Sequence, residues 1–324
     1  MTVPGAERAT AGPDAPEGLP YHLIQLSGRP GWWRQAVGIL LMIAWLALFA
    51  ALLVSIPFAI WYAVRGDNVA DSITALADSA NPTPTSLAYI DLVLTTLIPV
   101  AILLSWMLHR VGPRWLLSVA GRIRWRWLLV CVGAAVVALI ATVVVGALMP
   151  QQCDDTGGQA HLTHTAVAYL LVILVLTPLQ ASGEEFMFRG YLTQCLGALS
   201  RRAWVPVLLT AVVFGIFHGA GQPLPVFLSR FAFGLVAGYL VIRTGGLESG
   251  IAMHTLNNWL SLALAAIFDQ MGASLNPTCN SWWSLPVTLT QSLVYLGLVV
   301  LLCRRMGVGN TTDGRILEAP RSRV

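Results

Sequence analysis

Long apolar runs separated by short polar loops dominate the sequence. A helix needs about 20 predominantly apolar residues to cross the hydrocarbon core of a membrane. The pattern therefore predicts an all-α, polytopic membrane protein with about eight transmembrane helices. The runs cover Gly38–Val64, Ser86–Leu108, Trp127–Met149, Thr165–Ala181, Trp204–Phe217, Pro225–Ile242, Gly250–Phe268 and Leu285–Cys303.

Polar segments flank the apolar region at both ends. Residues 1–35 are rich in Pro, Gly and Ala, follow no regular period and lack the apolar stretch of a signal peptide. We therefore expect 1–35 and 304–324 to be flexible cytoplasmic tails, and 36–303 to form one transmembrane domain.

The composition excludes two classes of protein. Of the 324 residues, 56% are hydrophobic and 10% are charged, and the mean hydropathy is +0.71. An ordinary soluble domain has about 25% charged residues, and a disordered chain needs low hydrophobicity. Neither a soluble enzyme nor a disordered chain fits these values.

The charged residues alternate in sign from one loop to the next. Because cytoplasmic loops are enriched in basic residues, we expect an integral protein of a bacterial plasma membrane with both termini in the cytoplasm. No basic stripe occurs outside these loops, which argues against nucleic-acid binding. The predicted inner loops carry Arg110, Arg114, Arg122, Arg124, Arg126, Arg201, Arg202, Arg243, Arg304 and Arg305, and the outer loops carry Asp67, Asp71, Asp78, Asp154, Asp155 and Asp269.

Two of the five cysteines, Cys153 and Cys279, fall in predicted outer loops. In an oxidising compartment they form either a disulfide or two free thiols, and the sequence leaves both alternatives open. The spacing of cysteines and histidines does not match a zinc-binding pattern.

Three clusters of polar residues interrupt the apolar runs in the second half of the chain. Ionisable side chains inside a membrane segment are costly, and by default they mark function. The clusters consist of Glu184, Glu185 and Arg189, then Phe214 and His218, then His254, Asn257 and Asn258.

Helical spacing separates the roles of these side chains. Glu185 and Arg189 are four residues apart, so they share a face and are expected to form an ion pair. Glu184 lies about 100° around the helix from Glu185 and can point into a cavity. His254 and Asn258 share a face of another helix.

A carboxylate, two imidazoles and an amide on three helices suffice for peptide hydrolysis without a cofactor. A desolvated carboxylate can act as the general base that activates water, and His and Asn can stabilise the oxyanion. A serine protease is disfavoured because Ser182 and Ser229 lack a GxSxG context. An aspartyl protease needs two intramembrane aspartates, and only Asp91 qualifies, near the end of a run. The HExxH motif of zinc proteases is absent.

The motifs EExxxR, FxxxH and HxxxN, in this order on apolar helices, resemble those of the CPBP family, also called Abi. This family comprises the type II CaaX prenyl endopeptidases and their bacterial relatives. The resemblance covers Val172–Leu262 and includes the run Phe231–Gly246 that leads into the last motif. We place the core of the family at residues 165–268.

The resemblance implies an intramembrane glutamic endopeptidase, and our first hypothesis is that it works without a cofactor or metal. Glu184 would activate the water, and His218 would position the water or transfer protons. His254 and Asn258 would form the oxyanion hole, with Asn257 a near-equal candidate by its angle on the helix. The substrate would be a membrane-associated peptide or protein, cut near its C-terminus or in a membrane-proximal segment.

Other readings of the same residues stay open. Glu185 and Arg189 are expected to support the site rather than to react. Glu184, Glu185, His218 and His254 together have the donor types that bind zinc, so a metal-dependent protease is an alternative. A non-catalytic scaffold or immunity protein and a proton-linked transporter are further alternatives.

Two charged residues lie in or beside the sixth apolar run. Arg230 lies within it and has three possible roles: reaching the cytoplasm, contacting substrate, or pairing with an inner carboxylate. Glu248 follows the run and is expected to be solvated.

Straight helices would keep two of the predicted site residues apart. Glu184 would lie near the inner face, whereas His218 would lie about 21 Å along its helix from the inner end. Pro178, Ser182 and Gly183 offer a place for a kink that removes this offset. We therefore expect a water-filled cavity that opens to the cytoplasm and reaches toward the middle of the membrane.

Overall fold

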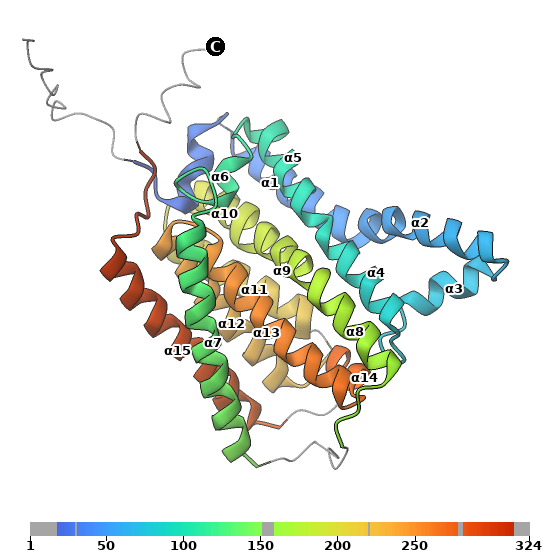
Figure 1. Cartoon of the computed structure of the whole chain (residues 1–324). Coiled ribbons are helices and arrows are strands. Elements are labelled where there is room, and N and C mark those ends of the chain that lie inside the picture. Colours follow the sequence, from blue (N-terminus) through green and yellow to red (C-terminus); the bar gives the residue numbers. More distant parts are fainter. Residues whose placement is uncertain (1–17, 30, 151–158, 220, 278–280, 314–324) are drawn as a thin grey trace, which may run out of the picture.

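All regular elements in the described part of the chain are helices (Figure 1). The structure is a computed structural model and describes residues 18–29, 31–150, 159–219, 221–277 and 281–313. The elements are the 3₁₀ helix η1 (Tyr21–Ser27), α1 (Trp32–Ala44), the π-helical turn η2 (Trp45–Phe49), α2 (Ala50–Arg65), α3 (Val69–Leu76), α4 (Pro84–Thr95), α5 (Leu97–His109), α6 (Arg114–Leu117), α7 (Trp125–Leu148), α8 (His164–Val175), α9 (Thr177–Glu185), the π-helical segment η3 (Phe186–Leu192), α10 (Thr193–Ser200), α11 (Trp204–Gly219), α12 (Leu224–Thr244), α13 (Glu248–Ile267), α14 (Met271–Leu275) and α15 (Ser284–Met306).

Five helical segments in these residues are long and apolar enough to cross a membrane. They are Trp32–Arg65, Pro84–His109, α7, α12 and α15, and α8 with Thr177–Ser200 forms a sixth span bent by 40°. The outward faces of these helices carry large apolar side chains, such as Leu52 and Leu129, which fit contact with lipid. The chain is therefore an integral membrane protein with five or six candidate spans.

The expected number of eight spans is higher because two helices, α11 and α13, are too short or not apolar enough to be candidate spans. At 16 residues, α11 is shorter than a full span. The other helix, α13, is 20 residues long, but His254, Asn257 and Asn258 lower its hydropathy. Both helices carry predicted site residues, so the polar groups that mark the site also weaken the signal of a membrane span.

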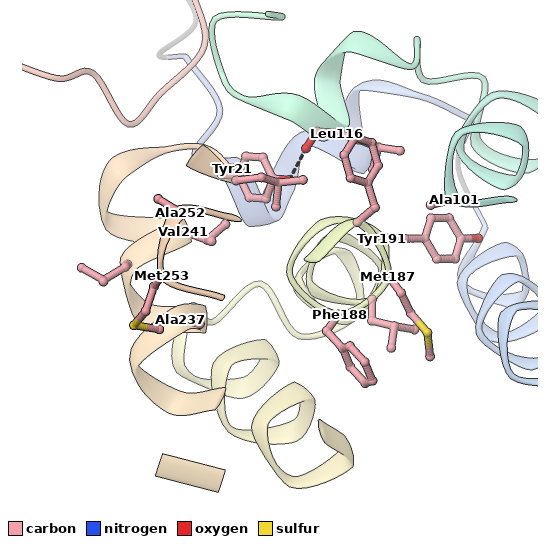
Figure 2. Packing of buried hydrophobic residues seen from close by; sticks show 14 of the residues in the cluster. Tyr21, Ala101, Leu116, Met187, Phe188, Tyr191, Ala237, Val241, Ala252 and Met253 are labelled. Atoms are coloured by element: carbon pink, nitrogen blue, oxygen red, sulfur yellow. Dashed lines mark hydrogen bonds between the residues drawn. The ribbon is translucent and has the colours of Figure 1, made fainter. Parts of the chain in front are cut away.

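The described parts of both expected tails are packed on the bundle. Tyr21 and Ile24 of η1 are fully buried, and the Tyr21 hydroxyl donates a hydrogen bond to the Leu116 carbonyl (Figure 2). The backbone N–H of Thr312 donates to the carbonyl of Leu19, which joins the two chain ends. Isolated apolar residues in a polar segment carried too little periodic signal to predict this packing.

A buried ion pair fixes the end of the bundle where the chain ends meet. Arg124, just before α7, donates to both carboxylate oxygens of Glu248 at 2.8 and 2.7 Å. It also donates to the carbonyls of Thr244 and Gly309. The expectation that Glu248 is solvated is therefore wrong, because an arginine distant in the sequence compensates its charge.

The helix that carries the first polar motif lies in the middle of the core. Figure 2 shows Met187, Phe188 and Tyr191 radiating from η3, with Val241 of α12 and Met253 of α13 packed on another side of the core. All five side chains are buried. This surrounding core holds the residues just before η3 in a fixed position.

Candidate active site

Three helical segments bring the predicted site residues to the same depth. Thr177–Ser200 is one continuous helix from α9 to α10, so Glu184 lies about 25 Å along it from Arg201. His218 lies about 21 Å along α11 from Trp204, at the same end of the bundle. Glu184 is therefore deep rather than near the inner face, and the expected offset from His218 does not arise.

The error in depth came from ending the fourth apolar run at Ala181. The bend lies earlier, between Val175 of α8 and Thr177 of α9, where Pro178 removes a backbone donor. Beyond it, the polar motif continues the same helix rather than starting a loop. Part of this helix, η3, has the wide π-helical turns that often occur at functional sites.

The Glu184 carboxylate is the centre of the cluster. It is 2% exposed, and its Oε2 lies 3.2 Å from His218 Nε2 and 3.6 Å from His254 Nε2. Its Oε1 accepts a hydrogen bond of 2.6 Å from Gln180 Nε2. One oxygen is thus held by an amide, and the other faces two imidazoles.

Hydrogen bonds on the far side of each ring determine which nitrogen faces Glu184. His218 Nδ1 lies 2.9 Å from the Phe214 carbonyl, which can only accept, so Nδ1 carries a proton. His254 Nδ1 lies 2.9 Å from Glu185 Oε1 and donates to it in the same way. In both rings, Nε2 is therefore the nitrogen that faces the Glu184 carboxylate.

Glu185 and Arg189 form the ion pair expected from their spacing. Arg189 Nη1 lies 2.9 Å from Glu185 Oε1, and both side chains are buried. The guanidinium also lies 4.3 Å above the ring of Phe214. Glu185 in turn holds His254, so this pair orients an imidazole that contacts Glu184.

An amide network connects Glu184 to the third motif. Gln180 Oε1 accepts from Asn258 Nδ2 at 3.1 Å, and Asn258 Oδ1 accepts from Asn257 Nδ2 at 3.3 Å. Sequence reasoning missed Gln180 because it is uncharged. Its position four residues before Glu184, on the same helical face, was the available signal.

A cavity of about 280 Å³ adjoins this cluster. Glu184, His218, His254, Asn257 and Asn258 line it, together with Gln180 and Asp91, to which sequence reasoning gave no role in the site, and Arg230, whose role it left open. Asp91 is buried and accepts a hydrogen bond of 2.9 Å from the hydroxyl of Thr177. As a single aspartate, Asp91 does not fit an aspartyl protease, but a carboxylate within an apolar run is by itself a signal of function.

The cavity lies toward the end of the bundle that is remote from the arginine-rich loops. Gln222, Ser274 and Pro277 line it and follow the ends of α11, α13 and α14. Arg201 and Arg243 lie at the opposite ends of the helices. The sequence predicted that the arginine-rich loops are cytoplasmic and that the cavity opens to the cytoplasm. Because the loops and the cavity lie at opposite ends of the bundle, these two predictions exclude each other.

The metal-dependent alternative requires several ligands that converge on one point. Among the described residues, no group of three or more His, Cys, Asp and Glu side chains is arranged to hold a metal ion. Two of the candidate ligands are engaged elsewhere, because Glu185 pairs with Arg189 and also contacts His254 Nδ1. Cys153 and Cys279 lie outside the described residues.

Comparison with known proteins identifies the region that holds this cluster. Residues 164–260 match the family described as "Type II CAAX prenyl endopeptidase Rce1-like". The matched segment contains every residue of the three sequence motifs. The chain contains an Rce1-like type II CAAX prenyl endopeptidase family domain. Four residues of α4, Leu87, Ile90, Asp91 and Leu94, line the cavity from outside this Rce1-like domain.

A bacterial relative shares part of the chain. The "Uncharacterized protein YyaK" of Bacillus subtilis (strain 168) is 28% identical over 141 residues, which cover 40% of this chain and 47% of the relative. The chain thus matches about half the length of this curated relative. No solved structure matches the chain.

Proposed function

We propose that the chain is an intramembrane endopeptidase of the CaaX type, in which Glu184 activates water to hydrolyse a peptide bond. The observation that carries this proposal is the convergence of two imidazole Nε2 atoms and one amide on the buried Glu184 carboxylate, at the wall of a cavity. The family match supports the same reaction class.

The first step uses Glu184 as a general base. A water in the cavity gives a proton to Glu184 and attacks the peptide carbonyl carbon, forming a tetrahedral intermediate. His218, whose Nε2 is 3.2 Å from the same carboxylate, then passes this proton toward the leaving amine. General acid–base catalysis of this kind contributes about 10²–10⁴-fold.

The oxyanion of the intermediate is stabilised by donors from α13. His254 lies between Glu185 Oε1 at 2.9 Å and Glu184 Oε2 at 3.6 Å, so its Nε2 is beside the carboxylate that activates the water. Asn258 has a second amide N–H besides the one bonded to Gln180. Loss of one such donor typically lowers the rate about 10²–10³-fold.

The proposal includes an orientation in the membrane. Eight spans with both termini in the cytoplasm place the arginine-rich loops inside, and the cavity then opens toward the opposite face. The substrate is a membrane-associated peptide or protein whose end or membrane-proximal segment enters from that face or from the lipid. Local unwinding near the membrane surface exposes the bond to water.

The decisive experiment compares Glu184→Gln with wild type in purified, detergent-solubilised protein and a peptide library. The substitution keeps the size of the side chain and removes the base, so cleavage should fall at least 100-fold. Asp71→Asn makes the same chemical change at an exposed site and should leave cleavage unchanged. Activity of Glu184→Gln equal to wild type, or a library left uncut by wild type, would reject the proposal.

A further inference from the structure

The end of the bundle opposite the cavity carries an exposed basic surface. Among the described acidic residues at this end, Glu248 is buried and paired with Arg124, and Asp313 is exposed. Positive charge therefore dominates the surface there, which attracts anions. The exposed arginines of this end are Arg29, Arg110, Arg114, Arg122, Arg126, Arg201, Arg202, Arg304 and Arg305.

Three arginines from separate segments meet where α5 ends. Arg29 follows η1, Arg34 belongs to α1, and Arg110 is the first residue after α5. The backbone N–H of Arg29 donates to the His109 carbonyl at 2.8 Å, and Arg34 Nη1 donates to the Leu108 carbonyl at 3.0 Å. Figure 1 shows α1 and α5 side by side at this end. Arg29, Arg34 and Arg110 are called the arginine cluster below.

The backbone around the arginine cluster is closely fitted. A Cβ at Gly28 would overlap the His109 carbonyl, so the chain can pass this point only without a side chain. Arg110 ends α5 in a left-handed conformation, with φ of 57°. His109 itself is buried, and its Nε2 lies 2.9 Å from the Tyr191 hydroxyl of η3. The arginine cluster is thus attached to the central helix of the core.

The end of α5 is prepared to accept an anion. Free carbonyls at the C-terminal end of a helix carry partial negative charge and would repel it. Here the Leu108 and His109 carbonyls already accept from Arg34 and Arg29. The guanidinium groups of Arg29 and Arg110 are exposed, and within the described ranges neither forms an ion pair with a carboxylate. They are available for an anion from outside the chain.

Two tryptophans indicate the depth of the arginine cluster in the membrane. Trp33 and Trp106 are 47% and 51% exposed. The Arg34 guanidinium lies 4.4 Å from the centre of the Trp33 ring, and that of Arg110 lies 5.8 Å from the Trp106 ring. Exposed tryptophans of a membrane protein concentrate at the level of the lipid headgroups. An anion that reaches the cluster at this level is the phosphate of a lipid.

We propose that the arginine cluster binds the headgroup of an anionic phospholipid at the end of α5. The planar guanidinium fork matches the oxygens of a phosphate in a bidentate arrangement. The exposed Leu41 of α1 and Leu103 of α5 belong to apolar surfaces that are available to the acyl chains. This lipid site does not depend on the reaction proposed for Glu184.

The test measures lipid binding to the purified full chain in a neutral detergent by native mass spectrometry. The probes are phosphatidylglycerol and phosphatidylcholine with identical acyl chains, and the result is the ratio of their dissociation constants. An arginine near an anionic headgroup contributes about 5-fold. Wild type, with three arginines in the cluster, should therefore bind phosphatidylglycerol about 100-fold more tightly, and Arg29→Gln/Arg110→Gln should retain a preference of only about 5-fold.

A matched variant separates a defined site from the overall charge. Arg304→Gln/Arg305→Gln removes the same charge at the same end of the bundle, but from α15, which packs on α7 and α12. It should keep the wild-type ratio. Equal losses in the two double variants would show that net charge alone attracts the lipid and would overturn the proposal.

A second variant guards against misfolding at Arg110. Asparagine tolerates a positive φ better than most residues, so Arg29→Gln/Arg110→Asn replaces the double glutamine variant if that protein does not fold. The expected ratio is the same. An unchanged wild-type ratio in a folded double variant would overturn the role of the arginine cluster.

Soluble compounds distinguish a lipid from a free phosphate. Glycerophosphoglycerol, which is the headgroup without acyl chains, and inorganic phosphate should not displace phosphatidylglycerol when each is added at the concentration of the lipid. Displacement by either compound would assign the arginine cluster to a soluble phosphate and overturn the lipid assignment. Equal binding of the two phospholipids by wild type would also overturn it.

Discussion

Replacing Gln180 with Met should slow peptide hydrolysis without unfolding the protein. Gln180 Nε2 donates to Glu184 Oε1 at 2.6 Å, and Gln180 Oε1 accepts from Asn258 Nδ2 at 3.1 Å. The amide thus orients both the proposed base and a proposed oxyanion donor. Methionine is similar in length and apolar, so it fills the space but makes neither hydrogen bond.

The size of the effect follows from the bond to the carboxylate. A hydrogen bond to a charged group contributes about 1.5–3 kcal/mol, and each 1.36 kcal/mol in the activation barrier is a factor of ten in rate. If Glu184 loses this orientation only in the transition state, kcat should fall about 10- to 150-fold. KM should change little, because Gln180 is not expected to hold the remote parts of the substrate.

The assay is steady-state cleavage of a peptide selected from the library, quantified by mass spectrometry, together with thermal unfolding in detergent. Gln194→Met is the matched control, because Gln194 is also buried and also donates one hydrogen bond, to the Trp115 carbonyl, but lies outside the cavity. It should lower the unfolding temperature and keep kcat. A kcat of Gln180→Met within twofold of wild type, or an equal loss in Gln194→Met, would refute the reasoning.

Two further predictions concern the stability of the bundle. Glu248→Gln leaves Arg124 without its buried counter-ion and should destabilise the fold by about 3 kcal/mol. This value is at the lower end for such pairs because the Arg124 side chain is 15% exposed. An unchanged unfolding temperature would show that this ion pair does not stabilise the fold. Gly250→Ala adds a Cβ that would overlap the Glu185 carboxylate, so overpacking of about 1–3 kcal/mol should exceed the gain in helix propensity of about 1 kcal/mol. Gly133→Ala in α7, where nothing lies within 4 Å of the added Cβ, should stabilise instead, and equal shifts for the two glycine variants would refute the close contact.

Residues with a formal charge inside an apolar run were identifiable from the sequence. Glu184, Glu185 and Arg189 stood out for that reason, and the spacing of the last two predicted the ion pair that the structure contains. Gln180 has no charge, and a single amide in a helix gives no signal until its partner is known. Arg230 was visible, but its lack of a partner in the described residues depends on what the other helices place around it.

Errors in the sequence interpretation arose where a contact links distant segments. The fourth run seemed to end at Ala181 because local hydropathy falls there, whereas burial in the core allows the helix to continue to Ser200. Glu248 seemed solvated because its partner Arg124 lies more than a hundred residues earlier. Hydropathy describes the preference of each residue for water or lipid. It contains no information about whether a residue of another helix compensates its charge.

The sequence by itself determined the class of the protein and indicated the residues of its candidate site. Apolar runs of near-spanning length required helices in a membrane, because only internal hydrogen bonding satisfies a backbone in hydrocarbon, and the rare ionisable residues within them marked the site. The tertiary structure alone decided the shared depth of Glu184 and His218, the amide that links Glu184 to Asn258, and the end of the bundle toward which the cavity lies. Those features depend on how far neighbouring helices are shifted along one another. Side-chain packing between the helices sets this shift, and the periodicity within a single helix contains no information about it.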